Sequence, residues 1–196
     1  MRTTRRTSLF AALLGVALPL VLAGGASAAG LDQLEQGALA APADADATWQ
    51  LVKAYREQAA NQRAVDFLTR FHAAHAPNAQ SLVWQGSFKA LLASRETDIE
   101  KRFDLLQTGT ADMDGAVRLF AGAPGVRAVR GITLSRFPEF MKMSGKAIDD
   151  LETALGPGSG LSDGLREAAR QALGQAYRQA GRPADADALQ KSASVR

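Results

Sequence analysis

From Asp46 onward, apolar side chains recur every three or four residues along the chain. The first such segment places Trp49, Val52, Tyr55 and Ala59 on one stripe, which is the pattern of a helix that buries one face. No segment shows the sustained alternation of apolar and polar residues that is typical of a half-buried strand. The sequence therefore predicts an all-α protein.

Glycine and proline divide this pattern into eight predicted helices, because both residues punctuate helical segments. The expected ranges are 46–60, 62–74, 79–94, 96–120 and 126–136, then a helix that follows an interruption at 137–140 and ends near 155, and finally 162–180 and 183–192. The fourth helix is the longest, since its apolar seam runs from Ile99 to Phe120 with Thr110 as its single polar member. Taken in order, the eight helices make four hairpins.

The last hairpin carries a recognisable pattern. Leu173-Gly174 is followed by Tyr177, and the turn reads Gly181-Arg182-Pro183-Ala184. This arrangement of a small residue, an aromatic residue and a glycine turn resembles the tetratricopeptide repeat (TPR). The resemblance covers about residues 45–196 and extends to exported bacterial TPR-containing proteins of undefined role. It implies a TPR-like α-solenoid of about four helical hairpins.

The spacing between repeats supports the resemblance. The equivalent small position falls at Val52, Gly86, Gly131 and Gly174, so the intervals are 34, 45 and 43 residues. The first interval is the standard TPR period. The excess of 11 residues in the second interval is close to three α-helical turns. The second hairpin is therefore predicted to have an elongated second helix that keeps its apolar face inward.

The N-terminus has the pattern of a secretory signal peptide. Three arginines at positions 2, 5 and 6 precede an uncharged apolar run, Leu9–Leu22, and the small triplet Ala26-Ser27-Ala28. We predict a signal peptide at 1–28, cleaved near Ala28, with a retained membrane anchor as the alternative. The Ala-rich stretch 29–45 is predicted to be a linker or N-terminal cap, and 46–196 the TPR-like helical domain. The expected location is periplasmic or secreted.

Charge and composition exclude several classes of function. The chain has a formal net charge of +3, but the three arginines of the predicted signal peptide account for it, which leaves 20 basic and 20 acidic residues. We therefore expect no nucleic acid among the partners and no stable membrane insertion after cleavage. The chain has no cysteine, which excludes disulfide scaffolds, cysteine zinc sites and thiol nucleophiles.

No catalytic constellation is visible in the sequence, so we predict that the protein is not an enzyme and has no cofactor or metal. His72 and His75 are the only histidines, and a pair of ligands is too few for a metal site. A hydrolase with a dispersed pair of acids leaves little local signature and stays an alternative.

Two groups of residues are candidates for binding. Arg127, Arg130, Arg136, Lys142 and Lys146 form the most basic stretch. It could attract an acidic partner, but we favour a solvated face that is neutralised by the acids of the following helix. The second group is a local insertion that departs from the repeat and concentrates apolar side chains: Phe137, Pro138, Phe140 and Met141.

The TPR resemblance also implies a concave groove lined by the first helix of each hairpin. By register, the groove residues would be Trp49, Lys53, Arg56, Val83, Ser87, Ala128, Ser135, Gln171, Gln175 and Arg178. Trp49 would be either an anchor for a partner or a cap on the end of the solenoid. Stacked helix pairs make extended concave surfaces that suit peptides or protein segments.

The sequence thus predicts an exported protein-interaction module or scaffold that binds a peptide or protein partner. The alternative is a periplasmic small-ligand carrier associated with a transport system, with the long fourth helix lining a pocket. The sequence leaves the oligomeric state open.

Overall fold

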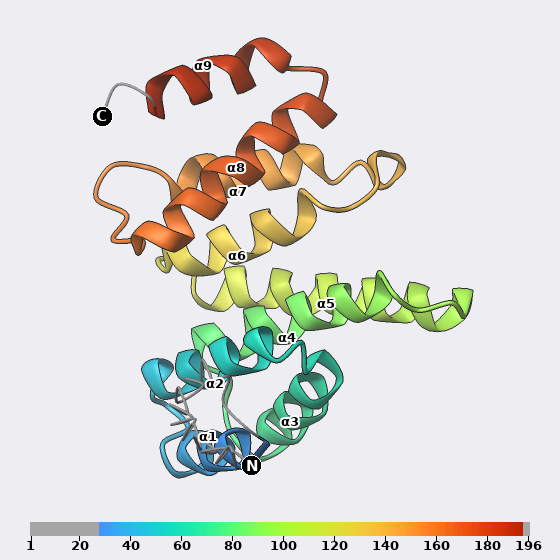
Figure 1. The fold of residues 1–196 in the computed structure, drawn as a ribbon, viewed down its shortest axis with the longest axis vertical. Helices are drawn as coiled ribbons and strands as arrows, with labels where there is room; N and C mark the ends of the chain where they lie inside the picture. Colours follow the sequence, from blue (N-terminus) through green and yellow to red (C-terminus); the bar gives the residue numbers. More distant parts are fainter. Residues whose placement is uncertain (1–27, 194–196) are drawn as a thin grey trace, which may run out of the picture.

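The computed structural model describes residues 28–193. Within this range the chain forms nine α-helices, one short 3-10 helix and no strand. The helices stack in chain order along the long axis of the molecule, from α1 at one end to α9 at the other (Figure 1). They are α1 (Ala28–Ala40), α2 (Ala45–Glu57), α3 (Asn61–Ala74), α4 (Ala79–Ala93), α5 (Ile99–Leu119), α6 (Pro124–Leu134), η1 (Glu139–Met141), α7 (Ser144–Ala154), α8 (Asp163–Gln179) and α9 (Pro183–Ala193).

The predicted all-α architecture of successive hairpins is confirmed, and α5 is the longest helix described, with 21 residues. Its start differs from the prediction by three residues. The side chain of Asp98 accepts hydrogen bonds from the backbone of Glu100 and Lys101, so Asp98 caps the helix and Glu96 lies before it. The interruption after α6 is also longer than predicted, since α7 begins only at Ser144.

Helix α1 precedes the predicted hairpins and packs against α2. Its residues Leu31 and Ala38 are buried. The Tyr55 hydroxyl donates a hydrogen bond to Glu35 (2.6 Å), and the Arg63 guanidinium also donates to Glu35 (2.6 Å). Residues 1–27 of the predicted signal peptide lie outside the described residues.

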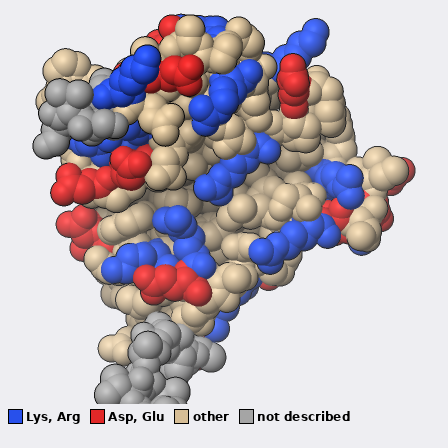
Figure 2. Space-filling model, turned by 45° about the horizontal axis from the view of Figure 1, so that its top comes forward, with Lys and Arg blue, Asp and Glu red and all other residues tan. Residues whose placement is uncertain are grey.

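Positive and negative side chains are interspersed over the face of the molecule shown in Figure 2. No helix in the described part of the chain is long and apolar enough to cross a membrane.

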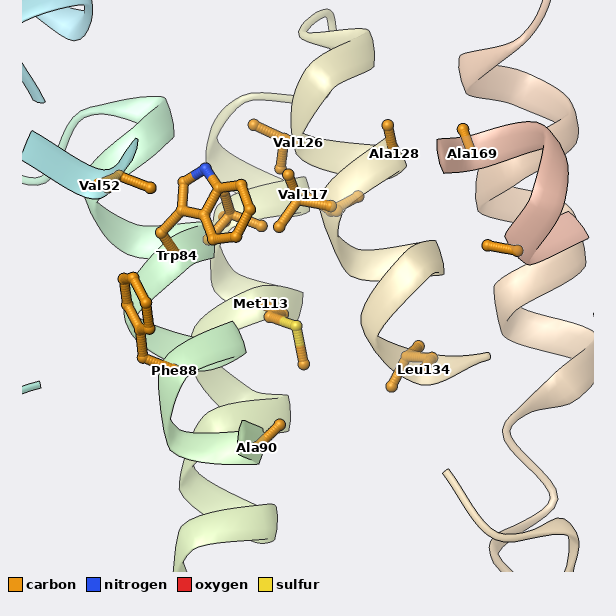
Figure 3. Packing of buried hydrophobic residues seen from close by; sticks show 14 of the residues in the cluster. Val52, Trp84, Phe88, Ala90, Met113, Val117, Val126, Ala128, Leu134 and Ala169 are labelled. Atoms are coloured by element: carbon orange, nitrogen blue, oxygen red, sulfur yellow. The ribbon is translucent and has the colours of Figure 1, made fainter. Parts of the chain in front are cut away.

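The hydrophobic core is continuous from hairpin to hairpin. Figure 3 shows Trp84 and Phe88 of α4 beside Met113 of α5, followed by Val126 and Leu134 of α6. Helices α4 and α5 approach each other closely at two glycines. A Cβ atom on Gly86 would lie 2.4 Å from the carbonyl oxygen of Gly109, so only glycine fits at this contact.

Candidate functional site

A cavity of about 480 Å³ opens in the middle of the molecule, between the second and third predicted hairpins. Four elements contribute to its walls: the C-terminal half of α4, the N-terminal half of α5, the end of α6 and the segment around η1. The lining residues are Ser87, Ala90, Leu91, Ala93, Ser94, Arg102, Leu106, Thr133, Arg136, Phe137, Pro138, Phe140 and Met141. All four residues of the predicted local insertion therefore line one cavity.

The insertion is held in place at both of its ends. Phe137 follows the end of α6 and is only 6% exposed, so it anchors the segment in the core. Pro138 precedes η1, and Lys142 closes it with a left-handed backbone at φ 54°. Between these points Phe140 is directed away from the core and is 81% exposed. The segment thus combines a buried anchor with an exposed phenylalanine at the edge of the cavity.

The N-terminal end of α5 extends the apolar surface beyond the cavity. Figure 1 shows this end of α5 projecting from the stack, on the same side as the loop between α6 and α7. Ile99 and Phe103 are 78% and 67% exposed, and with Leu106 they follow the i, i+4, i+7 spacing of one helix face. We refer to the cavity together with Ile99 and Phe103 as the α5–η1 groove.

The charged residues that line the cavity of the α5–η1 groove are all of one sign, whereas Asp98, Glu100 and Asp104 are exposed beside Ile99 and Phe103. The lining of the cavity contains Arg102 and Arg136 and no aspartate or glutamate. The Arg102 guanidinium donates to the backbone carbonyl of Glu96 at 2.9 Å. The Arg136 guanidinium forms no ion pair or hydrogen bond with any residue in the described part of the chain. The groove therefore offers unneutralised positive charge beside apolar walls.

Arg56 lies close enough to Arg136 to interact with it electrostatically. Its guanidinium stacks over the Trp84 ring, 4.9 Å from the ring centroid. Burial lowers the pKa of Arg56, and the positive charge of Arg136 lowers it further. The two cations repel each other, and Glu57 is the acid that opposes this effect.

Three of the five residues in the predicted basic stretch form ion pairs with acids of the protein itself. Arg130 donates to both carboxylate oxygens of the fully buried Asp150 (2.6 and 2.7 Å) and to Asp114 (2.9 Å). Lys146 also binds Asp114 (2.6 Å), and Arg127 binds Asp150 (3.1 Å). Burial lowers the pKa of Arg130, but Asp150 and Asp114 outweigh it and raise that pKa above its usual value.

This stretch is thus an ion-pair network that joins α5, α6 and α7. The predicted solvated face is therefore wrong for Arg130, which is only 8% exposed. Its charge is balanced by two acids on neighbouring helices, because α6 packs between α5 and α7. Of the five basic residues, Arg136 and Lys142 form no ion pair within the described residues.

The residues predicted to line a concave groove fall into two classes. Lys53, Arg56, Gln171, Gln175 and Arg178 are exposed, and Trp49 is half-buried against Trp84 with 5.9 Å between the ring centroids. The others are buried: Val83, Ser87, Ala128 and Ser135.

For these four buried residues the structure differs from the prediction. Val83 and Ala128 have no exposed surface. Ser87 bonds to Thr133 across the contact between α4 and α6, with 3.0 Å between the hydroxyl oxygens, and Ser135 donates to the carbonyl oxygen of Ile132. Adjacent first helices pack directly against each other. Val83, Ala128 and Ser135 therefore line neither cavity, and Ser87 lines the central cavity at the contact between α4 and α6.

The predicted groove residues also do not all meet at one place. Ser87 lies in the α5–η1 groove, whereas Gln171 and Arg178 line a second cavity of about 290 Å³ between α8 and α9. The two cavities share no lining residue.

Several residues of the α5–η1 groove were not among the predicted site residues, although the small-ligand alternative had the long fourth helix line a pocket. Ile99, Phe103 and Leu106 were assigned to a buried seam, and Arg102 was not singled out. The signal that could have found them is the unequal length of the two helices in this hairpin. Helix α5 has 21 residues and α4 has 15, so part of α5 must extend past its partner.

The histidines do not form a metal site together. Both ring nitrogens of His72 are engaged by neighbouring side chains, Nδ1 by Gln85 at 2.7 Å and Nε2 by Ser81 at 2.9 Å. No group of three or more candidate metal-binding side chains comes together among residues 28–193.

No protein-family model and no curated protein sequence matches this chain. Among solved structures, the fold is similar to that of the crystal structure of MamA, with a TM-score of 0.53 and 18% sequence identity over 83% of each chain. MamA is a TPR-like protein. At this level of identity the likeness shows the fold, and the predicted TPR-like all-α solenoid is confirmed.

Proposed function

We propose that this protein is a protein-interaction scaffold that binds a peptide segment of a partner in the α5–η1 groove. The observation that carries the proposal is the exposure of Ile99, Phe103 and Phe140 around an apolar cavity. Contiguous exposed apolar surface on a soluble domain marks an interaction site more often than scattered single residues do. A partner would bury these side chains, and their removal from water would supply most of the binding free energy.

The dimensions of the groove favour a protein segment over a small molecule. From Ile99 to Leu106 the surface of α5 extends by about 10 Å, at 1.5 Å per residue, and this strip continues the cavity. The apolar side chains of α5 recur at helical spacing, which suits a partner helix whose own anchors recur at i, i+3 and i+4. No reaction and no cofactor are part of the proposal.

Peptide binding would test the proposal. A displayed library of randomised helical peptides is selected on residues 29–196, and the affinity of a selected peptide is measured by fluorescence anisotropy. We expect Phe103→Ala and Phe140→Ala each to weaken binding by about tenfold, as hot-spot residues do. Leu119→Ala is the matched control, because Leu119 is an equally exposed apolar residue (65%) at the other end of α5. Equal affinities for all variants would contradict the proposal.

We also propose that the protein is exported and works in the periplasm or outside the cell. The support is the order of arginines, apolar run and Ala26-Ser27-Ala28 triplet at the N-terminus. Intact mass spectrometry of the protein recovered from a periplasmic fraction should give the mass of a chain that begins at Ala29. Recovery of the full-length mass in the membrane fraction would instead favour a retained anchor.

A small-ligand carrier is a second candidate because the cavity volume of about 480 Å³ lies within the range of ligand pockets. Native mass spectrometry of protein purified from its own cells separates the two functions. A carrier should retain a bound small molecule, and that adduct should disappear in a variant that fills the cavity, Ala90→Phe. An adduct-free mass together with peptide binding would support the scaffold.

A further inference from the structure

We infer that the partner segment carries an acidic side chain, which pairs with Arg136 while an adjacent apolar side chain enters the cavity. The inference rests on the proposed function and specifies the chemistry of the partner. It follows from how charge is distributed in the lining of the cavity.

The first observation is the one-sided charge of the cavity. Arg102 and Arg136 are the only ionisable residues in its lining. Arg56 acts electrostatically on Arg136 while its guanidinium lies over Trp84. Three guanidinium groups are thus gathered near one apolar cavity. Glu139 on η1 is exposed and forms no ion pair with any described residue, so this neighbouring acid leaves Arg136 available.

The second observation is the contrast with cations on the same helices. Lys89 of α4 binds Asp112 at 2.7 Å, and Arg130 of α6 binds Asp150 and Asp114. Arg136 follows α6 only six residues after Arg130, yet no such acid faces it. A carboxylate from a partner would neutralise Arg136, and a guanidinium can hold both carboxylate oxygens at once. It would also relieve the repulsion between Arg136 and Arg56.

The third observation is that Arg136 lies next to the cavity that would receive the apolar side chain of the partner. Arg136 is adjacent in sequence to Phe137, which is buried and lines the cavity, and the exposed Phe140 also lines it. A partner helix whose apolar anchor enters the cavity would carry its acid within about one helical turn of that anchor, since one turn spans about 5.4 Å. The inferred recognition element is therefore an acidic amphipathic helix.

A charge-swap experiment tests this inference with the selected peptides themselves. We expect the selected sequences to be enriched in Asp or Glu beside an apolar anchor. One such peptide is then synthesised with its acid as Glu, Gln or Lys, and each form is titrated against the wild-type protein and Arg136→Glu. Wild type should prefer the Glu form over the Lys form by about tenfold, as for a charge-assisted ion pair beside an apolar surface. Arg136→Glu should reverse that preference.

The control variant is Arg118→Glu, because Arg118 is exposed near the other end of α5. It should leave the preference for the Glu peptide unchanged. The inference is overturned if selected peptides carry no acid, or if Arg136→Glu and wild type rank the three peptides alike. If binding in that case still depends on Phe103 and Phe140, the scaffold proposal stands alone. If binding does not depend on them, the scaffold proposal fails as well.

Discussion

Gly86 is the residue at which helices α4 and α5 come closest. A Cβ atom there would meet the carbonyl oxygen of Gly109 at 2.4 Å and Cγ of Met113 at 2.6 Å. We predict that Gly86→Ala lowers the free energy of unfolding by about 2 kcal/mol, because the helices must separate to admit one methyl group. Urea denaturation followed by circular dichroism measures this change.

The matched control is Gly37→Ala in α1, where an added Cβ has no neighbour within 4 Å. It should stabilise the protein by about 0.5–1 kcal/mol, since alanine is the better helix former. If the two substitutions had the same effect, the close packing of α4 on α5 would be disproved.

His72 makes the stability of the protein depend on pH. Burial lowers the pKa of His72 below its ordinary value of 6.5, and the hydrogen bond with Gln85 offsets this only in part. As the pH falls through 6.5, the unfolded chain takes up a proton that the folded chain binds more weakly. The contribution of His72 to stability is therefore full above this pH and is lost below it.

We predict that wild type loses more stability between pH 7 and pH 5.5 than His72→Gln does, because burial lowers the pKa of His72 and the folded chain therefore binds the proton more weakly than the unfolded chain does. Denaturation curves of both proteins at the two pH values measure the difference. A wild-type protein that is more stable at pH 5.5 would contradict the prediction.

The N-terminal cap residue of α4 also forms hydrogen bonds with the start of α2, whereas the cap residue of α2 serves its own helix only. Asn78 accepts a hydrogen bond from the backbone of Ser81, and its side-chain amide donates to Thr48 (2.8 Å) and to the carbonyl oxygen of Pro42 (3.0 Å). Asp44 caps α2 in the same way but is exposed. We predict losses of unfolding free energy of about 3 kcal/mol for Asn78→Ala and about 1 kcal/mol for Asp44→Ala.

Thermal denaturation of both variants tests this comparison. Equal losses would mean that the bonds from Asn78 to the start of α2 contribute nothing beyond the helix cap.

The sequence predicted the positions of the individual helices well, because glycine and proline mark their ends and apolar spacing marks their length. The extent of α5 followed from its seam up to Phe120. The exposure of Ile99 and Phe103 could not be predicted from the sequence. Periodicity shows that side chains share a helix face but not whether another helix covers that face. The end of α4 at Ala93 leaves them without cover.

The site was predictable in part for the same reason. The break in periodicity at Phe137–Phe140 marked the insertion, because it departs from the repeat. The groove predicted by register failed at Val83 and Ala128, since register alone does not tell how closely adjacent hairpins pack. The roles of Arg130 and Asp150 depend on how the consecutive helices α5, α6 and α7 pack, which the spacing of apolar residues does not show.

The whole molecule is a linear stack in which each hairpin contacts its neighbours. In such stacks, stability comes from neighbouring interfaces and the ends open first. Among the described residues of α9 only Ala186 is buried, whereas α4 buries nine residues, Phe88 among them.

We predict that backbone amides of α9 exchange with deuterium far faster than those of α4. Hydrogen exchange measured by mass spectrometry on the free protein gives the rates helix by helix. Equal protection of α9 and α4 would show that the molecule opens as one cooperative unit.

The same measurement on a peptide complex shows whether a partner binds in the α5–η1 groove. Hydrogen exchange is compared between free protein and protein saturated with a selected peptide. We predict slower exchange at residues 99–106 and 136–143, and no change in α8 and α9. Protection confined to the cavity between α8 and α9, or no protection near α5 and η1, would contradict partner binding in the α5–η1 groove.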